Sequence, residues 1–427
     1  MAREMKDSGF VWLGQIPHDW EIRKLKHYYT LKTGFTPDTK KQEYYDETGY
    51  DWVNISDLSN GATIYETRKK ISQAYVDAFS PEQIPAGSLM YSFKLSVGQT
   101  SFAGKPLFTN EAIASFLASE TVDLHYLRYS SSFIIENAQT NIYNAKILNQ
   151  DLINNAYVPF PPLAEQARIA AFLDRKCAEI DSVIADTQRT IEEYKKLKQS
   201  VITQAVTKGI RGERPMKDSE IEWVGQIPSE WDVVRIKTLF DYRNERNNKP
   251  LEEVNLISLY TDKGVVQHCD LEETTGNKAS NADGYKLVYQ DDIVVNIILC
   301  WMGAIGRSSY SGVTSPAYDV YSPKPKTNSE FYHYYFRTSG FSGDCYKYGR
   351  GIMAMRWRTY SDEFRALQVV CPSVEEQDEI VAYLDEKCDA IDRIIAAKQQ
   401  LIAEMEVYKK SVIYEYVTGK KEVPACQ

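Results

Sequence analysis

The sixteen residues "CYKYGRGIMAMRWRTY", from Cys345 to Tyr360, carry four cationic side chains interleaved with aromatic rings, and no acid. Arginine makes bidentate contacts with guanine edges and with phosphates, and the glycines at 349 and 351 would let the backbone approach a phosphate closely. The stretch therefore favours a nucleic-acid contact over the alternative, a cationic surface turn around a buried Trp357. The candidate residues are Lys347, Arg350, Arg356 and Arg358.

Two earlier stretches carry other polar side chains. "YSFKLSVGQTSFAGKPLFTNEA", from Tyr91, resembles a strand–loop–strand segment presenting polar groups, and "NAQTNIYNAKILNQ", from Asn137, is rich in amides. Amides pair with adenine edges, although Asn-rich loops are also common in proteins that bind no nucleic acid. The candidate DNA-binding residues here are Lys94, Gln99, Lys105, Asn110 and Lys146.

Sequence motifs for catalysis are missing. The closest string to the [ND]-P-P-[YF] tetrapeptide of adenine methyltransferases is "SPAY" at Ser315–Tyr318, which lacks the initial Asn or Asp. There is no phosphate-binding G-x-x-x-x-G-K-[ST], no G-x-S-x-G, and no Cys and His spacing typical of a metal site. We therefore expect no catalytic residues, no metal and no cofactor bound by this chain itself.

Composition restricts the class of protein further. A net charge of −9, taken alone, argues against a nucleic-acid binder, because phosphate contacts need Lys and Arg, but it is a sum over the whole surface and does not describe local surfaces. Seven cysteines without a C-x-x-C pair, and no apolar run after "MAREMKDSG", predict reduced thiols and a cytoplasmic location. The longest apolar stretch, "IVVNIILCWMGAIG" from Ile293, is too short to span a bilayer.

The elements that must position these residues come in two copies. "WLGQIPHDW", Trp12–Trp20, returns as "WVGQIPSEW", Trp223–Trp231. At the same offset, "PPLAEQARIAAFLDRKCAEI" from Pro161 returns as "PSVEEQDEIVAYLDEKCDAI" from Pro372. Residues 27–160 and 238–371, between these echoes, show little resemblance to each other. The sequence thus records a duplication in which the middle segments diverged and the ends did not.

Both repeated ends predict long helices with a heptad seam, preceded by proline and followed by glycine. One helix cannot bury such a stripe alone, and the nearest partner is the other copy, so we predict a two-helix coiled coil. The alternative is that each helix lies on its own domain. The predicted seam residues are Leu173, Cys177, Ile180, Ile184 and Ile191 in the first copy, and Leu384, Cys388, Ile391, Ile395 and Ile402 in the second.

The divergent middles mix short β-like runs with many turn residues, which indicates α+β domains. The polar connector "GIRGERP", residues 209–215, separates the halves. We expect a first domain over 1–160, a central helix over 161–208, a second domain over 209–371 including that connector, and a C-terminal helix and tail over 372–427.

This order of parts resembles the specificity (S) subunit of type I restriction–modification systems over essentially the whole chain. The doubled W-x-G-x-I-P-x-x-W, the "PPLAEQ" that enters a long helix and its variant "PSVEEQ" carry the resemblance. "NEAIA" from Asn110, "SPAY" and "KYGRGIMAMRWRTY" also resemble strings in target-recognition domains. Ser373 departs from the pattern where the second proline is expected, and the two middles resemble different subclasses.

The resemblance implies two target-recognition domains and two long antiparallel helices, arranged with pseudo-twofold symmetry. It also implies an asymmetric, bipartite target in double-stranded DNA. Its expected partners are two methyltransferase (M) subunits, which carry S-adenosylmethionine, and restriction (R) subunits, which use ATP and Mg²⁺. Two other hypotheses compete: a self-sufficient DNA methyltransferase or nuclease with unrecognised motifs, and a coiled-coil scaffold that binds proteins only.

Overall fold

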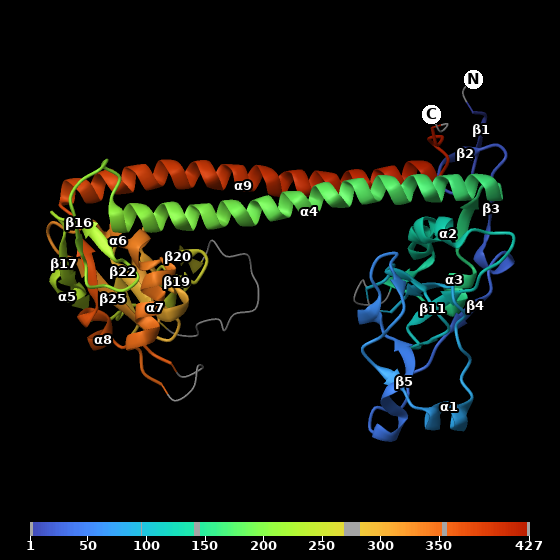
Figure 1. The fold of residues 1–427 in the computed structure, drawn as a ribbon, viewed down its shortest axis with the longest axis horizontal. Helices are drawn as coiled ribbons and strands as arrows, with labels where there is room; N and C mark the ends of the chain where they lie inside the picture. Colours follow the sequence, from blue (N-terminus) through green and yellow to red (C-terminus); the bar gives the residue numbers. More distant parts are fainter. Residues whose placement is uncertain (1–2, 95, 141–145, 269–281, 352–356, 425–427) are drawn as a thin grey trace. The chain divides into compact units, whose positions relative to one another are not determined.

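The computed structural model describes residues 3–94, 96–140, 146–268, 282–351 and 357–424 (Figure 1). They form two compact units: the first comprises Met1–Asp186 with Leu401–Gln427, and the second comprises Thr187–Gln400. Each unit is α+β. Among the described residues, none of the helices combines the length and apolarity that crossing a membrane requires.

The first unit is built on a five-stranded sheet in the order β4 (Leu31–Thr33), β11 (Ile113–Phe116), β8 (Leu89–Ser92), β9 (Thr100–Ala103) and β6 (Thr63–Ile64). Its neighbours are antiparallel except β6, which runs parallel to β9. Strands β8, β9 and β11 are buried along their whole length, so this sheet holds the core. A second sheet has the order β10 (Phe108–Thr109), β5 (Tyr45–Val53) and β7 (Lys70–Ile71). The short helices are α1 (Gln73–Phe79), α2 (Leu124–Ser130) and α3 (Gln150–Asn154).

The second unit has a four-stranded antiparallel sheet in the order β18 (Phe240–Arg243), β25 (Tyr318–Pro323), β22 (Ile293–Asn296) and β23 (Ile305–Arg307). Two further strand pairs are β19 (Ile257–Tyr260) with β20 (Gly264–Gln267), and β21 (Lys286–Val288) with β24 (Gly312–Thr314). The short helices are α5 (Ile236–Leu239), α6 (Ser329–Phe336), α7 (Ser339–Tyr348) and α8 (Ser361–Ala366). The divergent middles therefore fold into differently ordered sheets.

The repeated ends fold identically in the two units. Met5 pairs with Pro17 in the hairpin β1 (Met5–Asp7) and β2 (Gln15–Pro17), and Met216 pairs with Pro228 in β15 (Met216–Asp218) and β16 (Gln226–Pro228). The second repeated pair joins β3 (Glu21–Lys24) to β14 (Tyr157–Phe160) in one unit, and β17 (Asp232–Arg235) to β26 (Gln368–Cys371) in the other. The internal repeat predicted from the sequence is present in the fold.

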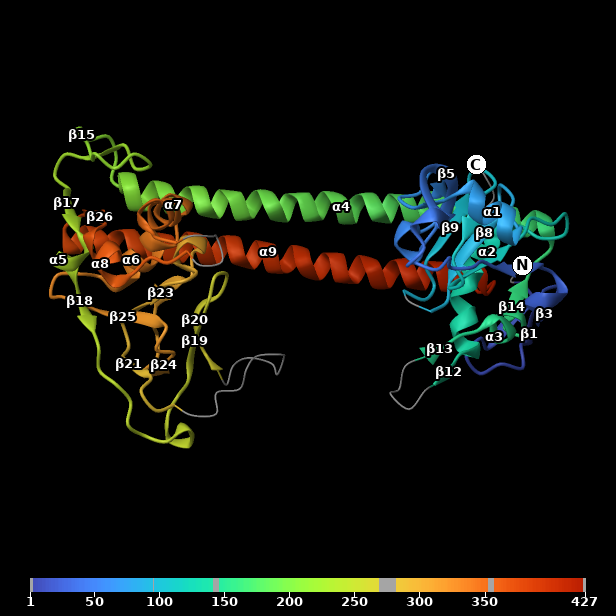
Figure 2. The same cartoon turned by 90° about the horizontal axis from the view of Figure 1, so that it is seen from below.

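Two long helices, α4 (Leu163–Lys208) and α9 (Val374–Val417), pass through both units and pair antiparallel in each (Figures 1 and 2). In the first unit Lys409 forms a 2.6 Å ion pair with Asp181, and in the second Lys198 forms one of the same length with Asp392. Seven of the predicted seam residues are buried, and Ile184, Ile395 and Ile402 are partly buried. The helices also pack on the domain cores at their N-terminal ends, through residues such as Leu173 and Leu384.

The repeated tryptophan anchors the first turn of each long helix. Trp20 is fully buried and its indole Nε1 donates to Glu165 Oε2 at 3.0 Å, while Arg3 Nη1 donates to Glu165 Oε1 at 2.6 Å. Trp231, Glu376 and Arg214 repeat this arrangement with distances of 2.9 and 2.6 Å. We call each trio a Trp–Glu–Arg cluster. The repeated W-x-G-x-I-P-x-x-W motif therefore has the same role in both halves: its second tryptophan holds the long helix to its domain.

The glutamine after each of these glutamates makes the second repeated connection. Gln166 donates to the Pro161 carbonyl oxygen at 2.8 Å and accepts from the amide of Asp123 at 2.9 Å, and Asp123 is the N-cap of α2. Gln377 does the same with the Pro372 oxygen and with Asn328, the N-cap of α6. The "E-Q" dipeptide therefore fixes a domain helix against the long helix in both units.

Candidate nucleic-acid interface

In the second unit, a loop that follows α7 is closed by a short backbone bridge. The amide of Arg350 donates to the Arg358 oxygen at 2.8 Å, and the reverse bond is 2.9 Å. Trp357 stacks on Tyr346 with ring centroids 5.0 Å apart, and its Nε1 donates to the Tyr346 oxygen at 3.0 Å. A Cβ at Gly349 would lie 2.5 Å from this nitrogen, so only glycine fits there. Arg350 and Arg358 are thereby held side by side at the base of the loop.

The cations on the last turn of α7 and on the loop after it differ in their surroundings. Lys347 is exposed and lies 3.2 Å from Glu222, whose hydrogen bond raises the pKa of Lys347. Arg350 is exposed and contacts Glu363. Arg358 is partly buried, and its Nη1 has no hydrogen-bond partner among the described residues. A buried donor left unpaired costs about 1–3 kcal/mol, so this guanidinium is suited to an acceptor supplied by a ligand. Arg356 lies outside the described residues.

In the first unit, the predicted residues divide between the two ends of the β8–β9 hairpin. Lys94 and Gln99 lie on the exposed turn that joins the strands. The adjacent turn before β11 contains Asn110, whose Oδ1 accepts from the Ala112 amide, and Glu111, which lies 3.7 Å from Lys94 Nζ. Lys94, Gln99 and Asn110 therefore lie at the same end of the strands β8, β9 and β11. Lys146 lies on β13 (Lys146–Ile147), paired with β12 (Gln139–Thr140), and its side chain lies outside the described residues.

Lys105 lies beyond the opposite end of β9, apart from Lys94, Gln99 and Asn110. Its Nζ is 2.6 Å from Asp51 Oδ2. Burial raises the pKa of Asp51, but hydrogen bonds from Lys105 and Thr67 outweigh burial and hold that pKa below its usual value. The carboxylate therefore stays charged and keeps Lys105 in place. Beside this pair lies a run that the sequence analysis passed over, Arg68, Lys69 and Lys70; three consecutive cations were the available signal.

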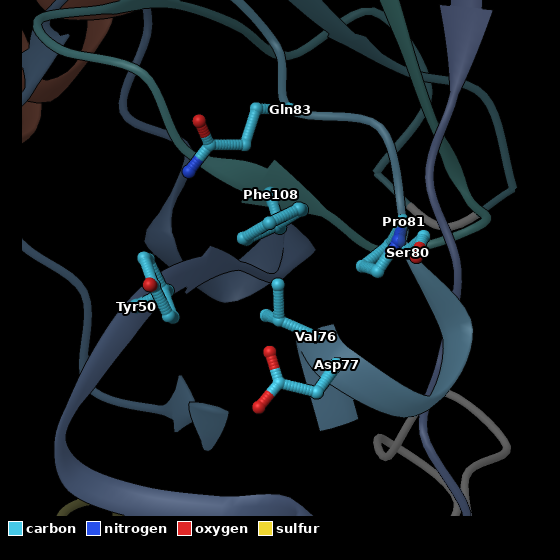
Figure 3. A pocket seen from close by; sticks show the side chains of 7 residues that line it. All are labelled: Tyr50, Val76, Asp77, Ser80, Pro81, Gln83 and Phe108. Carbon is cyan, nitrogen blue, oxygen red and sulfur yellow. The ribbon is translucent and has the colours of Figure 1, made fainter. Parts of the chain in front are cut away.

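A surface hollow of about 600 Å³ lies between β5, α1 and β10 of the first unit (Figure 3). Its only charged group is Asp77, which accepts a hydrogen bond from Gln73 at 2.6 Å. A carboxylate repels a phosphate, so the hollow does not extend the surface formed by Arg68, Lys69 and Lys70. The residues that line it are Tyr50, Val76, Asp77, Ser80, Pro81, Gln83 and Phe108. Within the described ranges, no group of three or more His, Cys, Asp or Glu is placed to hold a metal ion.

The sequence profile of the type I restriction modification DNA specificity domain matches the chain twice, over residues 17–193 and 228–406. Each match takes in one divergent middle and most of the long helix that follows it. The chain therefore belongs to this family of DNA specificity proteins. As a member it recognises DNA sequence for a restriction–modification complex, is not itself an enzyme and has no cofactor of its own. The self-sufficient methyltransferase or nuclease is accordingly not favoured.

Individual relatives agree with this assignment. The chain is 25% identical to a putative MjaX specificity subunit of Methanocaldococcus jannaschii, over 96% of each chain. It is 29% identical to the EcoBI specificity subunit of Escherichia coli, over 48% of this chain and 42% of the relative. A solved chain of a type I restriction–modification system superposes with a TM-score of 0.73 at 16% identity, covering 95% of this chain and 99% of the other. The HsdS subunit from Thermoanaerobacter tengcongensis gives 0.53 at 16% identity, covering 95% and 98%. At 16% identity, these two structures support the fold alone.

Proposed function

We propose that the chain reads an asymmetric DNA target in two separate parts, one with each unit. The observation that carries this proposal is a contrast within the fold. The repeated ends of the two units fold alike, whereas the sheets of the divergent middles differ. Base edges are read by side chains of the divergent surfaces, so unlike surfaces select unlike half-sites. Two readers on one face of B-DNA meet it about one helical turn, ~34 Å, or a multiple apart, which leaves unread base pairs between the half-sites.

Two copies of the same methyltransferase subunit would dock on the repeated helices. Val183 and Tyr408 in the first unit are 45% and 47% exposed, and Leu197 and Ile394 in the second are 48% and 38% exposed. The duplication matches Val183 with Ile394 and Leu197 with Tyr408. Each of the four precedes an a position of the heptad, which places it at g, and in an antiparallel pair the g positions of both helices flank the same side. Exposed pairs of large side chains at equivalent positions in both units suit two identical partners.

Mapping methylated bases in DNA exposed to the chain and its methyltransferase partner tests the two-part target. We expect an interrupted motif whose two parts differ. A continuous motif, or a palindromic one, would contradict the proposal. A protein-only scaffold would yield no dependence of methylation on this chain.

Replacing Arg350 with alanine should weaken recognition of one half-site only, by about 1–3 kcal/mol for a lost base contact. Lys94→Ala, at an exposed position of the first unit, is the matched variant and should affect the other half-site. Binding to duplexes mutated in one half-site at a time measures both effects. If the two variants impaired the same half-site, the assignment of one reader to each unit would be wrong.

The double variant Leu197→Glu/Ile394→Glu should bind one methyltransferase subunit instead of two, because it places charges in the apolar pair of the second unit. Native mass spectrometry of the complex measures the stoichiometry directly. Val183→Glu/Tyr408→Glu is the matched control and should also leave one subunit bound, while the fourfold variant should bind none. Two subunits retained by the fourfold variant would rule out this surface.

A further inference from the structure

The first unit carries a compact cationic turn that none of the predicted contacts includes. Strand β6 ends at Ile64 and β7 begins at Lys70, and the intervening segment contains Tyr65, Arg68 and Lys69. All three of these side chains are exposed, Tyr65 by 61%. We call residues 65–70 the Tyr65–Lys70 turn.

Asp51 fixes the backbone of this turn. The Thr67 amide donates to Asp51 Oδ1 at 2.8 Å. The single proton of the Thr67 hydroxyl is shared between the Lys69 carbonyl oxygen at 2.6 Å and Asp51 Oδ1 at 3.1 Å, and Lys70 pairs with Asp51 in the sheet. A turn tied to a buried carboxylate at this many points is held in one shape before any ligand arrives, which reduces the entropy lost on binding.

The backbone that follows β9 packs against the ring of Tyr65. The Gly104 amide donates to the Ile64 oxygen at 2.8 Å, and a Cβ at Gly104 would lie 2.6 Å from two atoms of the Tyr65 ring. The glycine therefore lets one side of the ring approach the backbone closely, while 61% of the residue stays exposed. An exposed aromatic ring held in this way is a ready contact surface for a flat or apolar group.

The cationic charges of the turn are not neutralised by ion pairs with the acidic residues that the structure describes. Lys105 and Asp51 neutralise each other, so the buried carboxylate does not repel an anion. Arg68, Lys69 and Lys70 make no ion pair with the described acidic residues, and Glu66 is the only acid in the turn itself. Three cations against one acid form a local positive surface on a chain of net charge −9.

We propose that the Tyr65–Lys70 turn binds the sugar–phosphate backbone of duplex DNA, with Arg68 and Lys69 on phosphates and Tyr65 against the neighbouring sugar. This inference rests on the proposed function, because that function supplies duplex DNA as the ligand. Contacts of this kind set the position of the first unit on the duplex and carry no sequence information. Lysine and arginine on phosphates release counterions, so their contribution is recognised by its dependence on salt.

The test is a salt titration of full-length chain binding to a random-sequence duplex and to its target duplex, with fluorescence anisotropy as the readout. For Arg68→Gln/Lys69→Gln, the slope of log K against log [salt] should fall in magnitude by about 2 on both duplexes. Lys26→Gln/Lys410→Gln removes the same charge from exposed positions of the same unit and should leave the slope unchanged. Tyr65→Ala should lower affinity on both duplexes with the slope kept, and Tyr65→Phe should bind like the wild type.

Thermal unfolding of each variant shows whether it is folded. An unchanged slope in Arg68→Gln/Lys69→Gln would overturn the inference, as would a loss confined to the target duplex, which would mean base contact. A wild-type chain without preference for its target would instead overturn the proposed function, and the slopes on the random duplex would still decide the inference. If the chain bound an acidic protein and did not bind duplex DNA, both the inference and the proposed function would be overturned.

Discussion

Replacing Glu376 with alanine should lower the free energy of unfolding of the second unit by about 2–4 kcal/mol, because it removes the buried carboxylate of an ion pair and the acceptor of a buried indole. The Glu376 side chain is 1% exposed and accepts from Arg214 at 2.6 Å and from Trp231 at 2.9 Å. The Arg214 side chain is 11% exposed; its Nη1 also donates to Glu230 Oε1 at 2.8 Å, and its Nε has no hydrogen-bond partner among the described residues. Removal of the Glu376 carboxylate would leave Trp231 Nε1 without this acceptor, and Arg214 Nη2 with only the Lys208 carbonyl oxygen at 3.2 Å.

The duplication supplies the matched control for this prediction. Glu165→Ala removes the same carboxylate from the first unit, where Arg3 keeps Asp19 at 3.0 Å as Arg214 keeps Glu230 at 2.8 Å, but Glu165 is 13% exposed. The loss there should be smaller, about 1.5–3 kcal/mol. Urea unfolding with hydrogen exchange to assign each transition to a unit measures both values. Equal losses would show that burial of the ion pair does not set its contribution.

The repeat and the long helices could be predicted from the sequence because both are local or self-similar patterns. The heptad seam is a period of seven residues, and the expected helix over 161–208 corresponds to α4, Leu163–Lys208. The duplicated phrases mark equivalent positions without any knowledge of contacts. The role of Trp20 was beyond this kind of argument, because its partner Glu165 lies 145 positions away.

The candidate interface was less predictable for the same reason. Sequence spacing grouped Lys105 with Lys94 and Gln99, but β9 carries Lys105 to the opposite end of the hairpin, where its partner is Asp51. The sheet orders of the two middles depend on long-range pairing, such as β6 joining β9 in parallel, which no local pattern encodes. The stacking of Trp357 on Tyr346 likewise depends on the loop closing back on α7.

A fragment of residues 187–400 should fold cooperatively by itself, whereas a fragment of residues 1–186 should not. The second unit is one continuous segment and contains all its own core residues, including those that both long helices contribute. The core of the first unit needs Val412 and Val417 from the end of α9. Tyr126 also donates to the Val417 oxygen at 3.1 Å, so the missing segment would leave a buried hydroxyl with one partner fewer.

Adding residues 401–427 should restore the first unit, and the geometry permits a direct fusion. Asp181 pairs with Lys409 across the antiparallel helices, so a short glycine-rich loop can join residue 186 to residue 401. Circular dichroism and thermal unfolding should show a cooperative transition in the fused fragment and a broad one in residues 1–186. A fused fragment carrying Val412→Asp and Val417→Asp keeps the length and should fail to fold. A sharp transition in residues 1–186 alone would mean that its core closes without α9, and the last segment of the chain would then serve the partner surface instead of the fold.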